Sequence, residues 1–300
     1  MGTGRPSVQR YYQAVCNRGR LGYGFALRAL FATRPCTVWH WPAFLPATLW
    51  ACVGVTMRPI AGPALRALGQ SETWPARWRY RWSTYHQREL DALLSLQQSR
   101  TDAAWLARHI TIAPGCKIPD GGAVLVALHH ANMRLLVSFC AKVLGWRLGG
   151  VVFAPFATWK YYTGPPESLL ADAYGDDASV PGLALGHGLR VLRAGGYFIV
   201  PLDVINGPWP CQPLLGKALP LARGALWLAA RSGRPIVPVA LVPRRRGHWD
   251  AWFGAPIEPT LASLARARED CLRRAPATWE LREWKAWHAA PLAPSTVASR

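Results

Sequence analysis

Acidic side chains and lysine are scarce in this chain of 300 residues. Sixteen aspartates and glutamates stand against 35 arginines and lysines, of which only five are lysine, so the formal net charge is +19. Charged residues make up 17% of the chain and hydrophobic residues 51%, a balance that excludes a disordered tail protein. A field this positive indicates an anionic partner: membrane lipid, nucleic acid, or an acidic protein or substrate.

Several common site motifs are also missing. The seven cysteines are widely spaced and include no C-x-x-C pair, which argues against a zinc ribbon or a redox pair. We read them as reduced, apolar side chains in a reducing compartment. No P-loop, G-x-G-x-x-G, G-x-S-x-G or H-E-x-x-H motif occurs, so the common nucleotide, hydrolase and zinc-protease classes have no support.

The first 71 residues are basic and apolar. They hold eight arginines but no lysine and no acidic residue, the first of which is Glu72. From 35 to 57 no arginine, lysine or acidic residue occurs, although prolines interrupt the run and tryptophans, which favour membrane interfaces, crowd it. We predict a short membrane-embedded or interfacial helix over 43–57, within a membrane-facing segment 1–71. A buried helix under the main domain, a membrane-spanning helix over 35–57 and an organelle transit peptide are the alternatives.

The remaining chain, 72–300, alternates short apolar runs with amphipathic stretches. Helix-like spacing over 76–110, with a break near 99–101, precedes this alternation. The predicted strands and helices follow in turn: strands 124–128, 149–156, 197–203 and 235–242, and helices 134–146, 187–195 and 222–233. The pattern predicts one α/β domain, packed with the N-terminal part, in which helices flank a mixed, mostly parallel sheet.

The strongest site candidate lies directly after strand 124–128, where the chain reads His129-His130-Ala131-Asn132-Met133-Arg134 before a helix. A histidine at a strand-to-helix junction is well placed for general base work, near backbone N–H groups that can hold an oxyanion. The alternative is a pair of hydrogen-bonded histidines that close a strand.

The segment from His129 to Leu136 resembles the H-x-G-N-W-E-L-L motif of the bacterial lipid A acyltransferase branch of the lysophospholipid acyltransferase superfamily. Further segments resemble that family in the same order: 192–196, Ile199 to Asp203 with Gly207, 215–216, 224–239, and Pro276, Trp279 and Trp284 of its C-terminal helix. The basic, apolar N-terminus is similar to its membrane-associating helix. The resemblance covers about two thirds of the chain.

The resemblance implies acyl transfer without a cofactor or metal. A fatty acyl group would pass from an acyl carrier protein or coenzyme A thioester to a hydroxyl of a lipid or glycolipid, with His129 as general base. The implied location is the cytoplasmic face of the bacterial inner membrane, held peripherally or by one N-terminal embedded helix. Anionic membrane lipid is an expected partner, whereas nucleic acid is not favoured, because no nucleic-acid-binding motif accompanies the charge.

The chain departs from the family at the catalytic acid, because Arg134 stands five positions after His129, where an acidic residue is expected. The family's arginine after the second strand is replaced by Phe153-Ala154-Pro155. One rescue is Asp203, which ends a strand expected near His129 and would complete a catalytic pair with it. The other is Arg134, which would bind an anionic group of the substrate.

The remaining candidates for substrate binding are His130, Asn132, Asn206 and Gly207, which flank the two strand ends. Asp203 as a solvated strand-end carboxylate and Arg134 as a solvated helix residue are the alternatives. If both alternatives hold, the chain lacks a catalytic acid. The alternative function is then that of an inactive homologue that binds lipid or acyl carrier without turnover.

Overall fold

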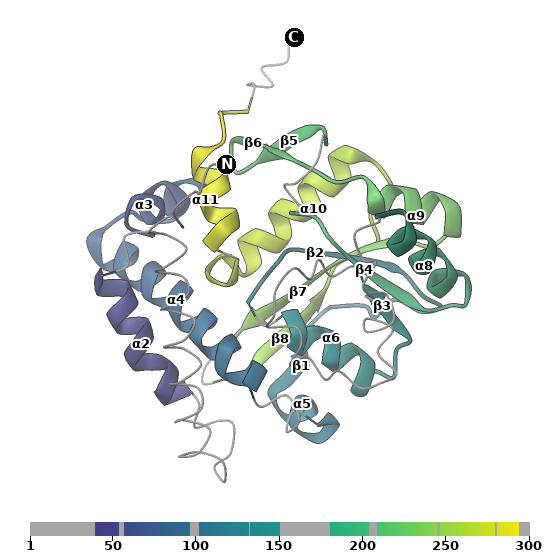
Figure 1. Ribbon diagram of the computed structural model, residues 1–300, viewed down its shortest axis with the longest axis horizontal. Coiled ribbons are helices and arrows are strands. Elements are labelled where there is room, and N and C mark those ends of the chain that lie inside the picture. The colour runs from purple at the N-terminus through teal and green to yellow at the C-terminus, as the bar shows by residue number, and fades with distance from the viewer. Residues whose placement is uncertain are drawn as a thin grey trace, which may run out of the picture.

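A twisted six-stranded sheet forms the centre of the computed structural model (Figure 1). The structure describes residues 40–53, 57–96, 102–131, 133–150, 181–203, 209–244, 247–279 and 281–293. The strand order is β1-β8-β7-β2-β4-β3, in which every pair is parallel except the antiparallel pair of β7 and β8. The strands are β1 (Ile110–Ile112), β2 (Val124–Ala127), β3 (Leu148–Gly150), β4 (Tyr197–Pro201), β7 (Ile236–Pro243) and β8 (Trp249–Phe253).

Helices cover both faces of this sheet, because side chains of the central strands alternate between two hydrophobic clusters. Val124 and Val126 of β2 face one cluster, which includes residues of α8 (Pro181–Arg193), α9 (Gly224–Ser232) and α10 (Leu261–Arg274). Leu125 and Ala127 face the other, with α5 (Ala103–His109) and α6 (Met133–Lys142). Strands buried on both faces read as continuous apolar runs, and the predicted α/β class with a mixed, mostly parallel sheet is confirmed.

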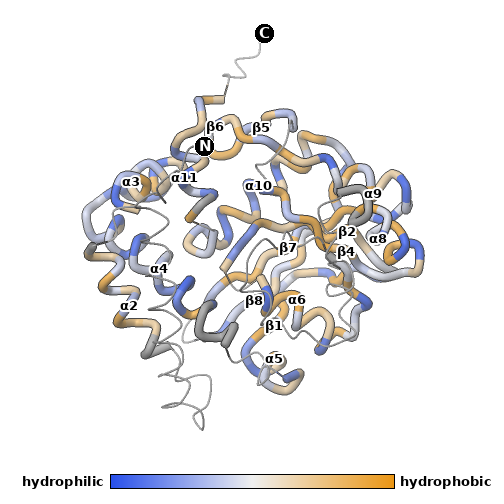
Figure 2. Tube along the Cα trace, viewed as in Figure 1, coloured by the Kyte–Doolittle hydropathy of each residue, from blue (hydrophilic) through white to orange (hydrophobic). Residues whose placement is uncertain are grey.

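Three helices at the N-terminal side of the described chain lie together at one side of the sheet (Figure 1). They are α2 (His40–Val53), α3 (Arg58–Ala67) and α4 (Trp74–Leu96). Small residues of α2, among them Ala47 and Ala51, are fully buried and let it lie close to α4. Its outer face exposes Phe44 (41%), Leu45 (73%) and Leu49 (59%), and hydrophobic residues run along the helix (Figure 2).

The predicted helix over 43–57 differs in its extent. Helix α2 begins earlier, at His40, and ends at Val53, while Met57 is the buried N-cap of α3, with a proline in that helix's first turn. Residues 54–56 lie outside the description. None of the helices in the described part of the chain is long and apolar enough to cross a membrane.

Other elements differ from the predicted pattern too. Strands β1 and β8, helix α10 and a small antiparallel hairpin of β5 (Cys211–Leu214) and β6 (Lys217–Pro220) were not expected. The predicted strand 149–156 is described only to Gly150 of β3, and its remainder lies outside the described residues. The expected C-terminal helix is α11 (Leu281–Ala289), preceded by the 3-10 turn η4 (Pro276–Thr278).

Candidate active site

The candidate site lies at the carboxyl ends of two neighbouring strands inside the sheet, β2 and β4. β2 and β4 are parallel neighbours, with Ala127 paired to Pro201. His129 and Asp203 each come two residues after these partners, so the strand register brings them side by side. Ligand and catalytic sites in such sheets lie at the carboxyl ends of the strands, which is where this pair stands.

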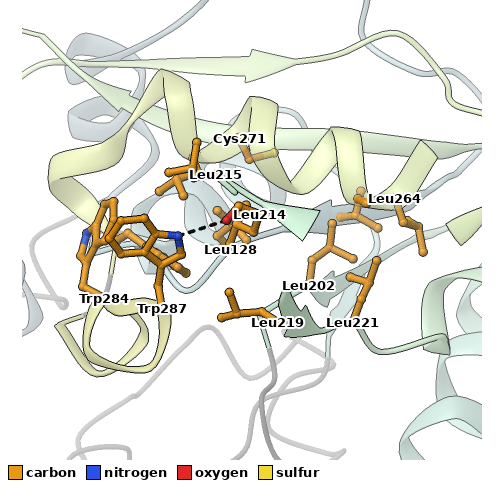
Figure 3. Close-up of a cluster of buried hydrophobic side chains, with 14 of the residues drawn as sticks. Leu128, Leu202, Leu214, Leu215, Leu219, Leu221, Leu264, Cys271, Trp284 and Trp287 are labelled. Carbon is orange, nitrogen blue, oxygen red and sulfur yellow. Dashed lines mark hydrogen bonds between the residues drawn. The ribbon is translucent and has the colours of Figure 1, made fainter. Parts of the chain in front are cut away.

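The residues that precede the pair anchor both strand ends in the core. Leu128 and Leu202 are fully buried and belong to the same hydrophobic cluster (Figure 3). The Leu202 N–H also donates to the carbonyl of Ala127 (2.7 Å). Because the chain is fixed one residue before each functional side chain, the backbone at His129 and Asp203 has little freedom to separate them.

His129 and Asp203 form a hydrogen-bonded dyad. The His129 ring Nδ1 lies 2.6 Å from one carboxylate oxygen of Asp203, and the His129 backbone N–H donates to the other at 2.8 Å. The Asp203 side chain is 2% exposed, whereas that of His129 is 33% exposed. A carboxylate accepts hydrogen bonds, so Nδ1 carries the proton and the lone pair of the neutral ring lies on Nε2, the form that a general base requires.

The buried carboxylate stays ionised despite its surroundings. Burial by itself would raise the pKa of Asp203, because a charge is poorly solvated in the interior. The attraction to His129 in its protonated form and the hydrogen bonds from His129 and Trp279 outweigh burial and lower the pKa to about 2. The carboxylate is therefore negative at neutral pH and stabilises an imidazolium on His129.

His130 is buried and hydrogen-bonds outside this dyad. It is 4% exposed, and its Nδ1 lies 2.7 Å from the hydroxyl of Thr278, which itself donates to the carbonyl of Ala275 (2.7 Å). The hydroxyl must therefore accept from Nδ1–H, which fixes the neutral tautomer. Burial, opposed by Asp203 and reinforced by His129, lowers the pKa of His130 to about 4. Its role in substrate binding stays a prediction.

The other predicted site residues fall into two groups. Arg134 is the second residue of α6 and is partly exposed at the end of the loop that carries His129. Asn132, Asn206 and Gly207 lie outside the described residues, so their predicted roles stay predictions. The structure thus brings together His129 and Asp203, the residue predicted to substitute for the acid that Arg134 replaces.

Trp279 is a site residue that the sequence did not reveal in this role. Its indole N–H donates to Asp203 at 2.8 Å, to the same oxygen that accepts from the His129 backbone. The family resemblance placed Pro276 and Trp279 in a C-terminal helix, and this is wrong. Pro276 begins the 3-10 turn and Trp279 has extended backbone geometry, bridged to His130, while Trp284 alone of the three lies in α11.

Arg268 of α10 is a second residue with no signal in the sequence. It is 1% exposed and donates to the carbonyls of Pro220 (2.8 Å) and Gln212 (3.0 Å), which ties the β5–β6 hairpin to the domain. Burial lowers the pKa of Arg268 to about 10, against an opposing effect of the negative charge of Asp203. Arg268 therefore adds positive charge behind the site without being exposed to solvent.

No protein-family model matches the chain, and no curated protein matches it. Among solved structures, the 1-acyl-sn-glycerophosphate (LPA) acyltransferase PlsC from Thermotoga maritima is similar, at 16% sequence identity and a TM-score of 0.34. The similarity covers 85% of this chain and 100% of that chain. Among the described residues, no cluster of three or more histidine, cysteine or acidic side chains is placed to hold a metal ion.

Proposed function

We propose that this chain is a membrane-associated acyltransferase that moves a fatty acyl group from a thioester to a hydroxyl of a lipid or glycolipid. The single observation that carries the proposal is the His129–Asp203 dyad at the carboxyl edge of the sheet. A partly exposed imidazole backed by a buried carboxylate is the arrangement of a general base. The motif resemblance around His129 supplies the reaction class.

In the proposed reaction, Nε2 of His129 removes the proton of the acceptor hydroxyl as its oxygen attacks the thioester carbonyl. The tetrahedral intermediate then collapses, the C–S bond breaks, and the thiolate leaves and takes the proton from the imidazolium. The ester and the free thiol are the products, and His129 returns to its starting form. Asp203 stabilises the imidazolium between the two proton transfers and holds the ring in the Nδ1–H tautomer.

Under this proposal the acid has moved to another strand. Arg134 occupies the position five residues after His129, where the family resemblance implies an acid, and Asp203 from β4 supplies a carboxylate through space. An orienting acid needs only to reach Nδ1, and the parallel register of β2 and β4 provides that reach. Arg134 is proposed to bind an anionic group of the donor or acceptor, because a guanidinium pairs well with phosphate and carboxylate.

Charge and surface shape support a location on an anionic membrane. Leu45 and Leu49 lie on the exposed apolar face of α2. They belong to segment 1–71, which holds eight arginines and no acidic residue. Each basic residue near an anionic surface contributes about 1 kcal/mol, and each buried leucine about 1.5–3 kcal/mol. We infer peripheral attachment to the cytoplasmic face of the inner membrane, with an acyl carrier protein or coenzyme A as the thioester carrier.

The test is acyl transfer followed by mass spectrometry. The purified protein is incubated with acyl carrier protein thioesters or coenzyme A thioesters, each with a mixed lipid extract, beside the His129→Ala variant. His288→Ala is a matched control, because His288 is an exposed histidine on α11. The proposal expects an acylated lipid that disappears in His129→Ala and persists in His288→Ala.

The second candidate, an inactive homologue, is favoured by Arg134 at the expected position of the acid. It predicts a folded protein that binds lipid vesicles and yields no acylated product with either class of donor. That outcome, or a product that survives His129→Ala, would overturn the proposed reaction.

A further inference from the structure

The short segment 275–279 contacts His130, Ala131 and the carboxylate of Asp203. Thr278 accepts the Nδ1–H of His130, its carbonyl accepts the N–H of Ala131 (2.6 Å), and Trp279 donates to Asp203. This segment comes from the far end of the chain, 76 residues after Asp203. The segment therefore holds in place the loop 129–131, which contains no acidic residue.

The Trp279 indole does more than fill the core. Its ring is fully buried and packs edge-on against Trp284 (4.7 Å between centroids), a contact that any aromatic ring of similar size can make. Its N–H donates to the buried carboxylate at 2.8 Å. A buried carboxylate has several acceptor sites, and each donor that reaches it restricts its rotation and spreads its charge.

The two oxygens of Asp203 have different partners. One oxygen accepts from the His129 ring, while the other accepts both the His129 backbone N–H and the Trp279 N–H. Without the indole donor, the second oxygen keeps its hydrogen bond from the His129 backbone N–H. Both of these hydrogen bonds then come from His129. Among the described residues, no hydrogen bond from another element would then hold the plane of the carboxylate toward the His129 ring.

We infer that Trp279 is a positioning residue of the dyad: its indole N–H holds the Asp203 carboxylate so that His129 keeps its proton on Nδ1. This inference rests on the proposed function only for its catalytic consequence. The tautomer of His129 is a property of the resting protein and can be measured whether or not an acyl acceptor is known.

The test uses Trp279→Phe, which removes the N–H and keeps an aromatic ring in the core. Trp287→Phe is the matched control, since Trp287 is 2% exposed, belongs to the same cluster and donates its N–H to the neutral carbonyl of Leu214 at 3.0 Å (Figure 3). Both variants lose a buried indole donor and the same volume. Only the first touches Asp203.

The readout is the two-bond correlation between ring protons and ring nitrogens in protein labelled with ¹⁵N-histidine, which reports the tautomer at pH 8. The wild-type protein and Trp287→Phe are expected to hold His129 as the Nδ1–H form, and Trp279→Phe to show loss of that form toward a mixture. Asp203→Asn gives the reference for complete loss, and His129→Ala assigns the signal.

A wild-type tautomer in folded Trp279→Phe, or an equal change in Trp287→Phe, would overturn the inference, because a packing role alone would then explain Trp279. Where acyl transfer is detected, the rate gives a second criterion. Trp279→Phe should lower kcat about tenfold or more with little change in KM, and Trp287→Phe should leave kcat per folded molecule unchanged. Absence of transfer in the wild-type protein would refute the proposed function and leave the tautomer result standing.

Discussion

Replacing Asp203 by asparagine removes one charge and keeps the shape of the side chain. The asparagine carbonyl is expected to face the two N–H groups of the His129 backbone and Trp279, because it is the only acceptor on the new side chain. Its NH₂ group then faces the His129 ring. The ring can accept that donor only through a bare Nδ1, so the proton moves to Nε2 and the base is lost.

The magnitude follows from the chemistry and from the pKa of Asp203. Loss of the correct tautomer through the same substitution in a serine-protease triad lowers kcat roughly 10⁴-fold, about 5 kcal/mol of transition-state stabilisation, and we expect a similar loss here. The folded-state pKa of about 2 against an ordinary 3.8 corresponds to about 2 kcal/mol of stability at pH 7. Because this pKa is depressed, that stability is complete above about pH 4 and is lost as the pH falls toward 2.

The assay combines acyl-transfer rates with urea denaturation at pH 7 and at lower pH. Asp250→Asn is the control, because Asp250 of β8 also accepts from two side chains, Thr111 (2.8 Å) and Arg244 (2.5 Å), far along the sheet from β4. It should lose stability without a comparable loss of rate. A rate for folded Asp203→Asn within tenfold of the wild-type rate would refute the role given to this carboxylate.

Three further outcomes are expected. His130, with a pKa of about 4 in the folded protein, resists protonation that the unfolded chain accepts below about pH 6.5, so stability falls by up to about 3 kcal/mol between pH 6.5 and 4. Urea titrations of His130→Gln should lack this decline, and an unchanged decline would contradict the assignment. Arg268→Ala leaves the carbonyls under the β5–β6 hairpin without their donor and should cost roughly 3 kcal/mol in chemical denaturation; a cost below 1 kcal/mol would show that Arg268 is dispensable. Leu45→Asp combined with Leu49→Asp should lower the affinity for anionic vesicles, measured by co-sedimentation, roughly 100-fold, while the circular dichroism spectrum stays the same. Unchanged affinity would show that α2 does not contact the membrane.

The central sheet was predictable because its strands are buried on both faces. β2, β4 and β7 are continuous apolar runs bounded by turns, and such runs have few alternatives when helices of suitable length lie between them. Strands β1 and β8 were not predictable in the same way. β1 has only three residues, and β8 alternates buried and partly exposed positions with two tryptophans, a pattern that a short loop also shows.

The candidate site divides along similar lines. His129 and Asp203 both follow predicted parallel strands, so their proximity could be expected from topology. The three hydrogen bonds that the Asp203 carboxylate accepts could not. Trp279 reaches Asp203 across 76 residues of sequence, and no local periodicity predicts a contact of that separation. Arg268 appeared in the sequence as one of many arginines, and only its burial distinguishes it.

His129 and Asp203 are proposed to work as one unit, and a double-mutant cycle on acyl transfer measures that directly. Rates are determined for the wild-type protein, His129→Ala, Asp203→Asn and the double variant under the same conditions. If the carboxylate acts through the imidazole, Asp203→Asn has no further effect once His129 is gone, and the double variant is as slow as His129→Ala. Losses that multiply in the double variant would show that the two residues act independently and would contradict the account.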